Sequence, residues 1–222
     1  MTGFPTGFLP YSEGMTFVDA DHPDVVAFAA RATAGAGSDR EKAVALFYAV
    51  RDGIRYDPYA LSGDPETYRA SAVLRAGAAY CIPKAVLLCA AARAVGLTAR
   101  LGFADVRNHL NSEKLRERMG GSDLFIWHGY VEFLLDGHWV KVTPAFNIEL
   151  CERFGVLPLD FDGEHDALFH PYTADGRAHM EYVRERGTFD ELPFDEIMGE
   201  FLPVFAQMLD RPPPVDAAFR PT

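Results

Sequence analysis

Cys81 is the residue of this sequence best placed to act as a nucleophile. It stands shortly before the stretch 86–95, which leaves almost no polar face. We expect a buried central helix that begins at or just after Cys81, with Pro83 in its first turn and Gly96 at its end. The dipole and the free N–H groups of a helix N-terminus favour an anion, so we expect Cys81 to be ionised to a useful extent near neutral pH. A buried thiol without chemistry is the alternative, because cysteine is among the most buried residue types.

A predicted β-hairpin carries His128. Residues 124–135 and 138–143 read as its two strands, and the Asp136-Gly137 dipeptide between them is typical of a two-residue turn. Such a turn sets the register of the hairpin. The expected cross-strand pairs are Leu135–His138, Leu134–Trp139, Glu132–Lys141 and Tyr130–Thr143, with Glu132 and Lys141 as a cross-strand ion pair. His128 and Thr143 then share one sheet face as diagonal neighbours, about 7–8 Å apart at their Cα atoms.

Three ordered motifs between about Ser71 and Asn147 resemble those of the transglutaminase-like superfamily, a papain-like cysteine fold. They read Y-C-I-P-K-A-V-L-L-C-A-A-A-R-A-V-G-L-T-A-R, then W-H-G-Y-V-E-F, then D-G-H-W-V-K-V-T-P. Each motif alone is weak, but the ordered set is quite specific. The resemblance implies an α+β domain in which the central buried helix packs on an antiparallel sheet.

In that family a Cys is the nucleophile, a His is the base, and an Asp before a Pro orients the His. The resemblance assigns the first two roles to Cys81 and His128, but Thr143 stands at the position of the Asp. A Thr hydroxyl can accept a hydrogen bond from the ring N–H, yet it brings no negative charge. Asn147 and Asp105 are alternative partners, since papain-like enzymes use a Cys-His-Asn set. Position favours Thr143 over Asn147.

The resemblance implies acyl transfer on an amide, with a peptide, a protein or a small amide as substrate. Water or an amine would be the acceptor, which makes the protein a hydrolase, a protease or an acyltransferase. Backbone N–H groups near Cys81 would hold the oxyanion. Tyr80, Trp127 and Trp139 could wall a substrate slot or belong to the core. The alternative function is a catalytically inactive binding module that keeps the cleft, because Thr143 replaces the family Asp.

Composition limits the class of protein and its partners. The chain has 222 residues, 49% of them hydrophobic, which suits one domain with an ample core. The net charge of −11 argues against nucleic acid or an anionic membrane as a partner. No transmembrane helix or signal peptide is expected. Three cysteines, with Cys81 and Cys89 on or beside one helix, favour a reduced, cytoplasmic setting. The sequence does not indicate an oligomeric state.

No motif indicates a metal or a cofactor. His109, His165, His170 and His179 lack the tight spacing of metal ligands, and no cysteine pair stands near them. No phosphate-binding glycine loop is present in the sequence. We therefore expect neither.

The other expected elements follow local signals. Asp21 or His22 caps a helix that starts at Pro23, Ser38 opens a capping box for a helix to about Asp52, and Ser71 caps a short helix that ends at Gly77. The remaining segments are a strand over 97–106 and helices over 112–119, 147–154, 180–186 and 194–209, the last broken by Pro203.

These elements predict a single domain over residues 1–209. Its motif-bearing core covers about 40–147, and a C-terminal extension covers about 148–209. The Pro-rich tail 210–222 is expected to be disordered.

Overall fold

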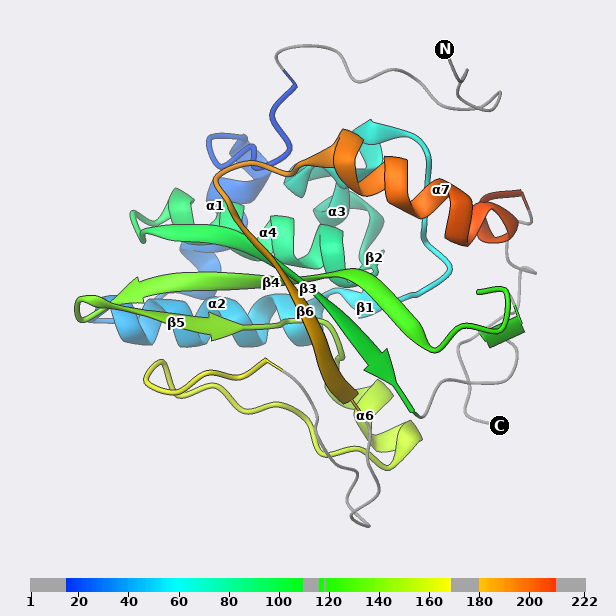
Figure 1. The fold of residues 1–222 in the computed structure, drawn as a ribbon. Coiled ribbons are helices and arrows are strands. Elements are labelled where there is room, and N and C mark those ends of the chain that lie inside the picture. Colours follow the sequence, from blue (N-terminus) through cyan, green and yellow to red (C-terminus); the bar gives the residue numbers. More distant parts are fainter. Residues whose placement is uncertain (1–14, 110–115, 118, 169–179, 211–222) are drawn as a thin grey trace.

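The computed structural model describes residues 15–109, 116–117, 119–168 and 180–210. It shows an α+β fold, as expected, in which a four-stranded antiparallel sheet packs against a central helix (Figure 1). The helices are α1 (Pro23–Ala32), α2 (Asp39–Gly53), α3 (Ala70–Ala76), α4 (Cys81–Ala94), α6 (Ile148–Phe154) and α7 (Phe194–Asp210), with a 3-10 helix η1 (Pro65–Tyr68). The strands are β1 (Arg55–Tyr56), β2 (Ala78–Ala79), β3 (Ala99–Asn108), β4 (Leu124–Leu135), β5 (His138–Val142) and β6 (Met180–Phe189). The sheet order is β5-β4-β3-β6, while β1 and β2 form a separate parallel pair.

Helix α4 is the centre of the core, as its sequence predicts. Every side chain from Cys81 to Ala92 is buried, and the helix packs on β4 and on α1, α2 and α3. Gly129 of β4 permits a close approach, because a Cβ built there would lie 3.0 Å from the Cα of Ile82. The N-terminus of α4 is therefore held directly against the strand that carries His128.

Local capping signals predict two of the three helix starts correctly. His22 caps α1 through the N–H of Asp24, and Ser38 forms the full capping box of α2. Helix α3 instead begins at Ala70, so the expectation that Ser71 caps it is wrong. The carboxylate of Asp19 accepts the N–H of Ser71 at 3.1 Å, so a distant segment supplies the partner that a cap would supply.

The hairpin has the predicted register over most of its length. The ladder contains Leu135–His138, Leu134–Trp139 and Glu132–Lys141, and it ends at Val131–Val142. The expected pair Tyr130–Thr143 is not in it, and the N–H of Thr143 donates to the carbonyl of Ala167 at 2.9 Å. Strand β5 therefore leaves β4 at Thr143, and the edge of β4 beside His128 is available to other groups.

Two expectations for the C-terminal part are wrong. Residues 180–186, expected as a helix, belong to strand β6, which pairs antiparallel with β3. The charged residues of this segment lie on an exposed edge strand, and pairing with β3 overrides their helical propensity. Helix α7 continues through Pro203 instead of breaking there.

Two further expectations fall largely or wholly outside the described residues. Most of the predicted helix 112–119 and all of 211–222 lie there. Within the residues that the structure does describe, no helix is long and apolar enough to span a bilayer.

Candidate active site

Cys81 is the first residue of α4, and its sulfur lies where the helix meets β4. The thiol is in hydrogen-bonding contact with the backbone N–H of Gly129 and with those of Ile82 and Cys81 itself. Cys81 is only 6% exposed. Burial raises the pKa of Cys81 to about 11, because desolvation of the thiolate outweighs the three N–H groups that stabilise it. The expectation that Cys81 is ionised near neutral pH is therefore wrong for the closed site.

Three buried tyrosines surround the Cys81 thiol. A charge on the sulfur would act on Tyr56, Tyr68 and Tyr80, and burial raises the pKa of all three phenols. Tyr80 donates to the hydroxyl of Tyr68 at 2.9 Å, and Tyr68 donates to the carbonyl of Ser62 at 2.8 Å. The thiol thus lies among neutral phenols, and Tyr80 stands beside it as expected.

His128 and Thr143 are in direct contact, as the hairpin register predicts. Nε2 of His128 lies 3.2 Å from Oγ1 of Thr143, and both residues are buried. The same hydroxyl donates to the carbonyl of Gly129 at 3.2 Å. A hydroxyl has one proton and a carbonyl can only accept, so Oγ1 accepts a hydrogen bond from Nε2–H. In the neutral imidazole the proton is then on Nε2 and the lone pair is on Nδ1.

Gly129 links the thiol to the residue that orients the histidine. Its N–H reaches Cys81 and its C=O accepts from Thr143. In an antiparallel strand both groups of one residue point to the same side, so these contacts occupy the edge that β5 has left. His128 directly precedes this glycine. The three residues assigned by the resemblance therefore meet around a single residue of β4.

Asp105 binds Trp127 and Arg186. The register of β3 and β4 shifts between Ala104 and Val106, so two residues of β4 lie opposite Asp105 alone. The second of them, Trp127, has a φ of +56°, and its N–H donates to Asp105 at 3.0 Å. Arg186 of β6 holds both carboxylate oxygens of Asp105, at 2.9 and 2.8 Å. Asp105 thus stabilises a β-bulge next to His128.

Asn147 also has another role. Its Oδ1 accepts the N–H of Tyr56 at 3.1 Å, so it binds β1 and gives α6 no side-chain cap. The structure places Thr143, and not Asn147, on the imidazole.

The two tryptophans do not form one substrate wall with Tyr80. Trp127 is 3% exposed and packs among Phe103, Phe189 and Arg186, so it belongs to the core. Trp139 is 38% exposed under the guanidinium of Arg100, which lies 3.9 Å from the ring centre. Successive residues of a strand point to opposite faces of the sheet. Leu134 and Trp139 pair across the hairpin and are both exposed, whereas the strand residues on either side of Leu134 are buried in the core. Trp139 therefore lies on the sheet face away from α4.

The predicted cross-strand ion pair between Glu132 and Lys141 is present, within a larger network of charges. Glu132 is buried, and its nearest cation is Arg100 of β3, at 2.6 Å. Lys141 is 3.7 Å from Glu132 and pairs more closely with Glu185, at 2.9 Å. The sheet therefore carries an ion-pair network that β3, β4, β5 and β6 share.

Two residues, Gly129 beside the thiol and Lys84 on the same helix, were not singled out from the sequence. Gly129 lies inside a strand, which often marks a close backbone approach. Lys84 is fully buried on α4 and donates to the carbonyls of Arg51 at 2.8 Å and Ile54 at 2.6 Å. Burial lowers the pKa of Lys84 to about 7. A lone lysine in an apolar helix was the available signal for this residue.

No metal centre emerges among the described residues. No group of three His, Cys, Asp or Glu side chains there could hold an ion. His109 pairs with Glu181 at 3.3 Å and His165 with Asp162 at 2.7 Å, while His170 and His179 lie outside those residues. The three cysteines, Cys81, Cys89 and Cys151, are free and buried.

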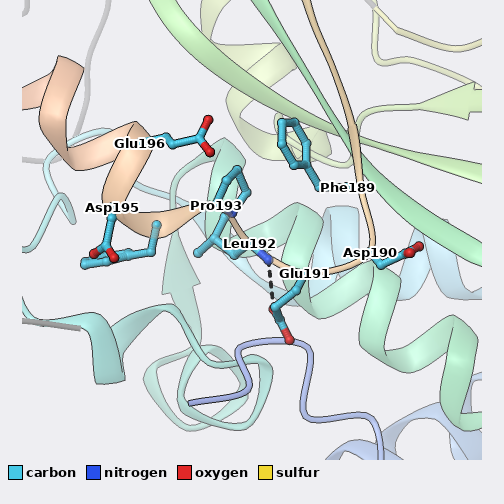
Figure 2. Close-up of a pocket in the computed structure, with 8 residues that line it drawn as sticks. Phe189, Asp190, Glu191, Leu192, Pro193, Asp195 and Glu196 are labelled. Carbon is cyan, nitrogen blue, oxygen red and sulfur yellow. Dashed lines mark hydrogen bonds between the residues drawn. The ribbon is translucent and has the colours of Figure 1, made fainter. Parts of the chain in front are cut away.

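A pocket of about 420 Å³ lies where β6 leads into α7 (Figure 2). Residues 189–196 line it, and none of them is a predicted site residue. Two of its aromatic residues nevertheless contact neighbours of the site. Phe189 packs on Trp127 with ring centres 6.2 Å apart, and Phe194 packs on Tyr68 at 5.1 Å.

Comparison with known proteins gives one match of family level. Residues 26–144, more than half of the chain, match the family model described as the transglutaminase-like superfamily. No curated protein matches the chain.

Two solved structures are similar in part. One is described as a "putative cysteine protease" from Cytophaga hutchinsonii, with a TM-score of 0.44 and 16% identity over 59% of this chain and 39% of the other. The second is described as a "putative protease" from Parabacteroides distasonis, with a TM-score of 0.38 and 17% identity over 57% of this chain and 27% of the other. The chain thus spans well under half the length of either structure.

Proposed function

Because the chain belongs to the transglutaminase-like superfamily, we propose that it is a cysteine-dependent acyl-transfer enzyme with Cys81 as nucleophile and His128 as base. One observation carries the proposal. The Gly129 N–H reaches the Cys81 thiol, and the Gly129 carbonyl accepts from Thr143, which holds Nε2 of His128. In the proposed mechanism, the Nδ1 lone pair of His128 takes the task of removing the thiol proton.

The proposed reaction begins with attack of the Cys81 sulfur on an amide carbonyl carbon. A C–S bond forms while the thiol proton moves to Nδ1 of His128. We assign the stabilisation of the developing negative charge to the backbone N–H groups of Ile82 and Gly129, which act on the sulfur. When the C–N bond breaks, His128 gives its proton to the leaving amine. Water or a second amine then attacks the thioester, its proton passes to His128, and Cys81 is regenerated.

Thr143 favours a neutral resting pair in this mechanism. A hydroxyl brings no charge to stabilise an imidazolium, and burial raises the pKa of the Cys81 thiol to about 11. We therefore propose a resting state in which the thiol keeps its proton and the imidazole is neutral. The proton moves only as the C–S bond forms, so His128 acts as a general base and not as half of an ion pair.

The proposed substrates are peptides, proteins or small amides, and no cofactor takes part. A panel of peptides and glutamine-containing amides tests the reaction by release of ammonia, a new N-terminus or incorporation of an amine. We expect turnover to vanish in Cys81→Ala and to persist in Cys89→Ala, which removes a buried thiol from the same helix. Turnover that survives Cys81→Ala would refute the assignment.

A catalytically inactive binding module is the second candidate. The specific observations in its favour are the hydroxyl of Thr143 at the family carboxylate position and the nearly closed, protonated Cys81. The same panel separates the two candidates. Binding of a peptide with equal affinity to the parent and to Cys81→Ala, without turnover by either, would favour the binding module.

A further inference from the structure

One short segment contacts the residue that directly precedes His128 and is linked through Tyr68 to the residue that directly precedes Cys81. The segment Arg186–Phe194 reaches Trp127, which precedes His128, and is linked by one further ring to Tyr80, which precedes Cys81. We propose that this segment is a positioning clamp that sets the placement of His128 relative to Cys81. The proposal rests on the proposed function, because relative placement matters only if the two residues act together.

On the histidine side, the clamp holds an unusual backbone conformation. Trp127 has a φ of +56°, which a bulky residue rarely adopts and which persists only where its surroundings impose it. Asp105 takes its N–H, and Arg186 holds Asp105 with two hydrogen bonds of 2.9 and 2.8 Å. The Arg186 guanidinium also lies 4.9 Å from the centre of the Trp127 ring.

Helix α7 anchors the arginine of this clamp. Glu200 accepts from Arg186 at 2.7 Å, on the guanidinium nitrogen that Asp105 does not use. The side chains of Arg186 and Asp105 are 8% and 6% exposed, so their geometry is fixed by packing. A change at Arg186 should therefore free the Asp105 carboxylate. The β-bulge would then lose its support, and the side chain of His128 could change its direction.

On the cysteine side, the clamp acts through aromatic rings. The ring of Phe194 packs edge-on against Tyr68 at 5.1 Å and stacks on Phe17 at 5.4 Å. The Tyr68 hydroxyl accepts a hydrogen bond from the Tyr80 hydroxyl at 2.9 Å, and Tyr80 is the N-cap residue of α4. Phe194 thus limits where the Tyr80–Cys81 turn can lie.

The segment lies outside the part of the chain that matches the family model. That match ends at residue 144, whereas the clamp belongs to β6, to α7 and to the link between them. Figure 2 shows this link running along the pocket, with Phe189 at one end and Asp195 and Glu196 at the other. In this proposal, the C-terminal extension therefore helps to position the residues of the proposed site.

Arg186→Gln tests the clamp, with Arg100→Gln as the matched control. Both variants remove an arginine that holds a buried carboxylate of the same sheet, but Arg100 holds Glu132, away from His128. The first readout is the ¹⁵N NMR spectrum of the His128 ring, which reports its tautomer. The second is the rate of Cys81 alkylation against pH, read by peptide mass spectrometry.

We expect Arg186→Gln to shift the His128 ring signals away from the Nε2–H tautomer and to change Cys81 alkylation by about tenfold or more, since small misplacements cost up to about a hundredfold. Arg100→Gln should keep the parent ring signals and a rate within about twofold, as expected for a change that leaves the barrier nearly untouched. Parent-like ring signals in Arg186→Gln would overturn the clamp.

Further variants keep the outcome decisive. If Arg186→Gln does not fold, Glu200→Gln removes only the anchor on α7, and unchanged His128 ring signals in that folded variant would also count against the clamp. Failure of the proposed function is seen separately, as Cys81 alkylation that does not change in His128→Ala. Even if the proposed function fails in this way, the His128 ring signals of the parent and of Arg186→Gln still test the clamp.

Discussion

The change Thr143→Val removes the hydroxyl that orients His128 while it keeps the size and shape of the side chain. Two hydrogen bonds are lost, one from Nε2–H of His128 and one to the carbonyl of Gly129, each 3.2 Å long in the parent. His128 is 3% and Thr143 is 4% exposed, so water does not easily replace the lost partner. At about 1–2 kcal/mol for each group left unsatisfied, we expect the free energy of unfolding to fall by about 2–4 kcal/mol.

The effect on chemistry follows from the tautomer of His128. Without the hydroxyl, nothing in the observed contact keeps the proton on Nε2 and the lone pair on Nδ1. We expect kcat/KM, or the Cys81 alkylation rate where no substrate is known, to fall about ten- to a hundredfold, which corresponds to about 1.4–2.7 kcal/mol. Denaturant unfolding and these rates are measured on the same samples, at a temperature where the variant is fully folded.

Thr143→Ser is the matched control, because it keeps the hydroxyl and removes only a methyl group. It should retain reactivity to within about threefold, which is less than 1 kcal/mol in the barrier. A parent-like rate in folded Thr143→Val, together with a rate that still depends on His128, would refute the conclusion that Thr143 sets the tautomer.

Three further predictions follow from burial and close packing. The free energy of unfolding should rise with pH between about pH 7 and 8.5, by up to about 1.4 kcal/mol per pH unit. Burial lowers the pKa of Lys84 from 10.5 to about 7, so in this range the unfolded chain binds more protons than the folded one. Denaturant titrations should show a smaller slope with pH in Lys84→Met, and an equal slope would contradict the assignment. Cys81 should react with iodoacetamide more slowly in folded than in denatured protein at pH 7–8, and the folded rate should climb toward about pH 11, the value to which burial raises its pKa; a folded rate above the denatured one would show a preformed thiolate. Gly129→Ala should lower the free energy of unfolding by about 1–3 kcal/mol, because the new Cβ would lie 3.0 Å from the Cα of Ile82 and 3.2 Å from the Cys81 carbonyl oxygen; Gly53→Ala, where a Cβ meets nothing within 4 Å, is the control and should be near neutral in the same unfolding assay.

The central helix and the hairpin could be predicted because their signals are local. An apolar run before Gly96 predicts the buried α4, and Asp136-Gly137 sets the register that brings Thr143 to His128. The family motifs cover the same elements. These parts of the site depend on residues that are close together in the sequence.

The rest depends on partners from distant segments. The pKa of Cys81 is set by burial among Tyr56 and Tyr68, which belong to β1 and η1. The β-bulge at Trp127 needs Asp105 and Arg186, and the residues around Arg186 were themselves predicted as a helix. Desolvation and long-range pairing of this kind leave no local pattern, so the sequence alone could not supply them.

The closed position of Cys81 also bears on how the protein withstands oxidants. Peroxides attack the thiolate and not the thiol, and sulfenic acid forms most readily at exposed cysteines of low pKa. Cys81 is 6% exposed, and its pKa is raised to about 11, so at neutral pH almost none of it is in the form that peroxide attacks. Burial therefore protects the Cys81 thiol from peroxide, and if Cys81 is the nucleophile, as proposed, a substrate that opens the site would also expose the sulfur to oxidation.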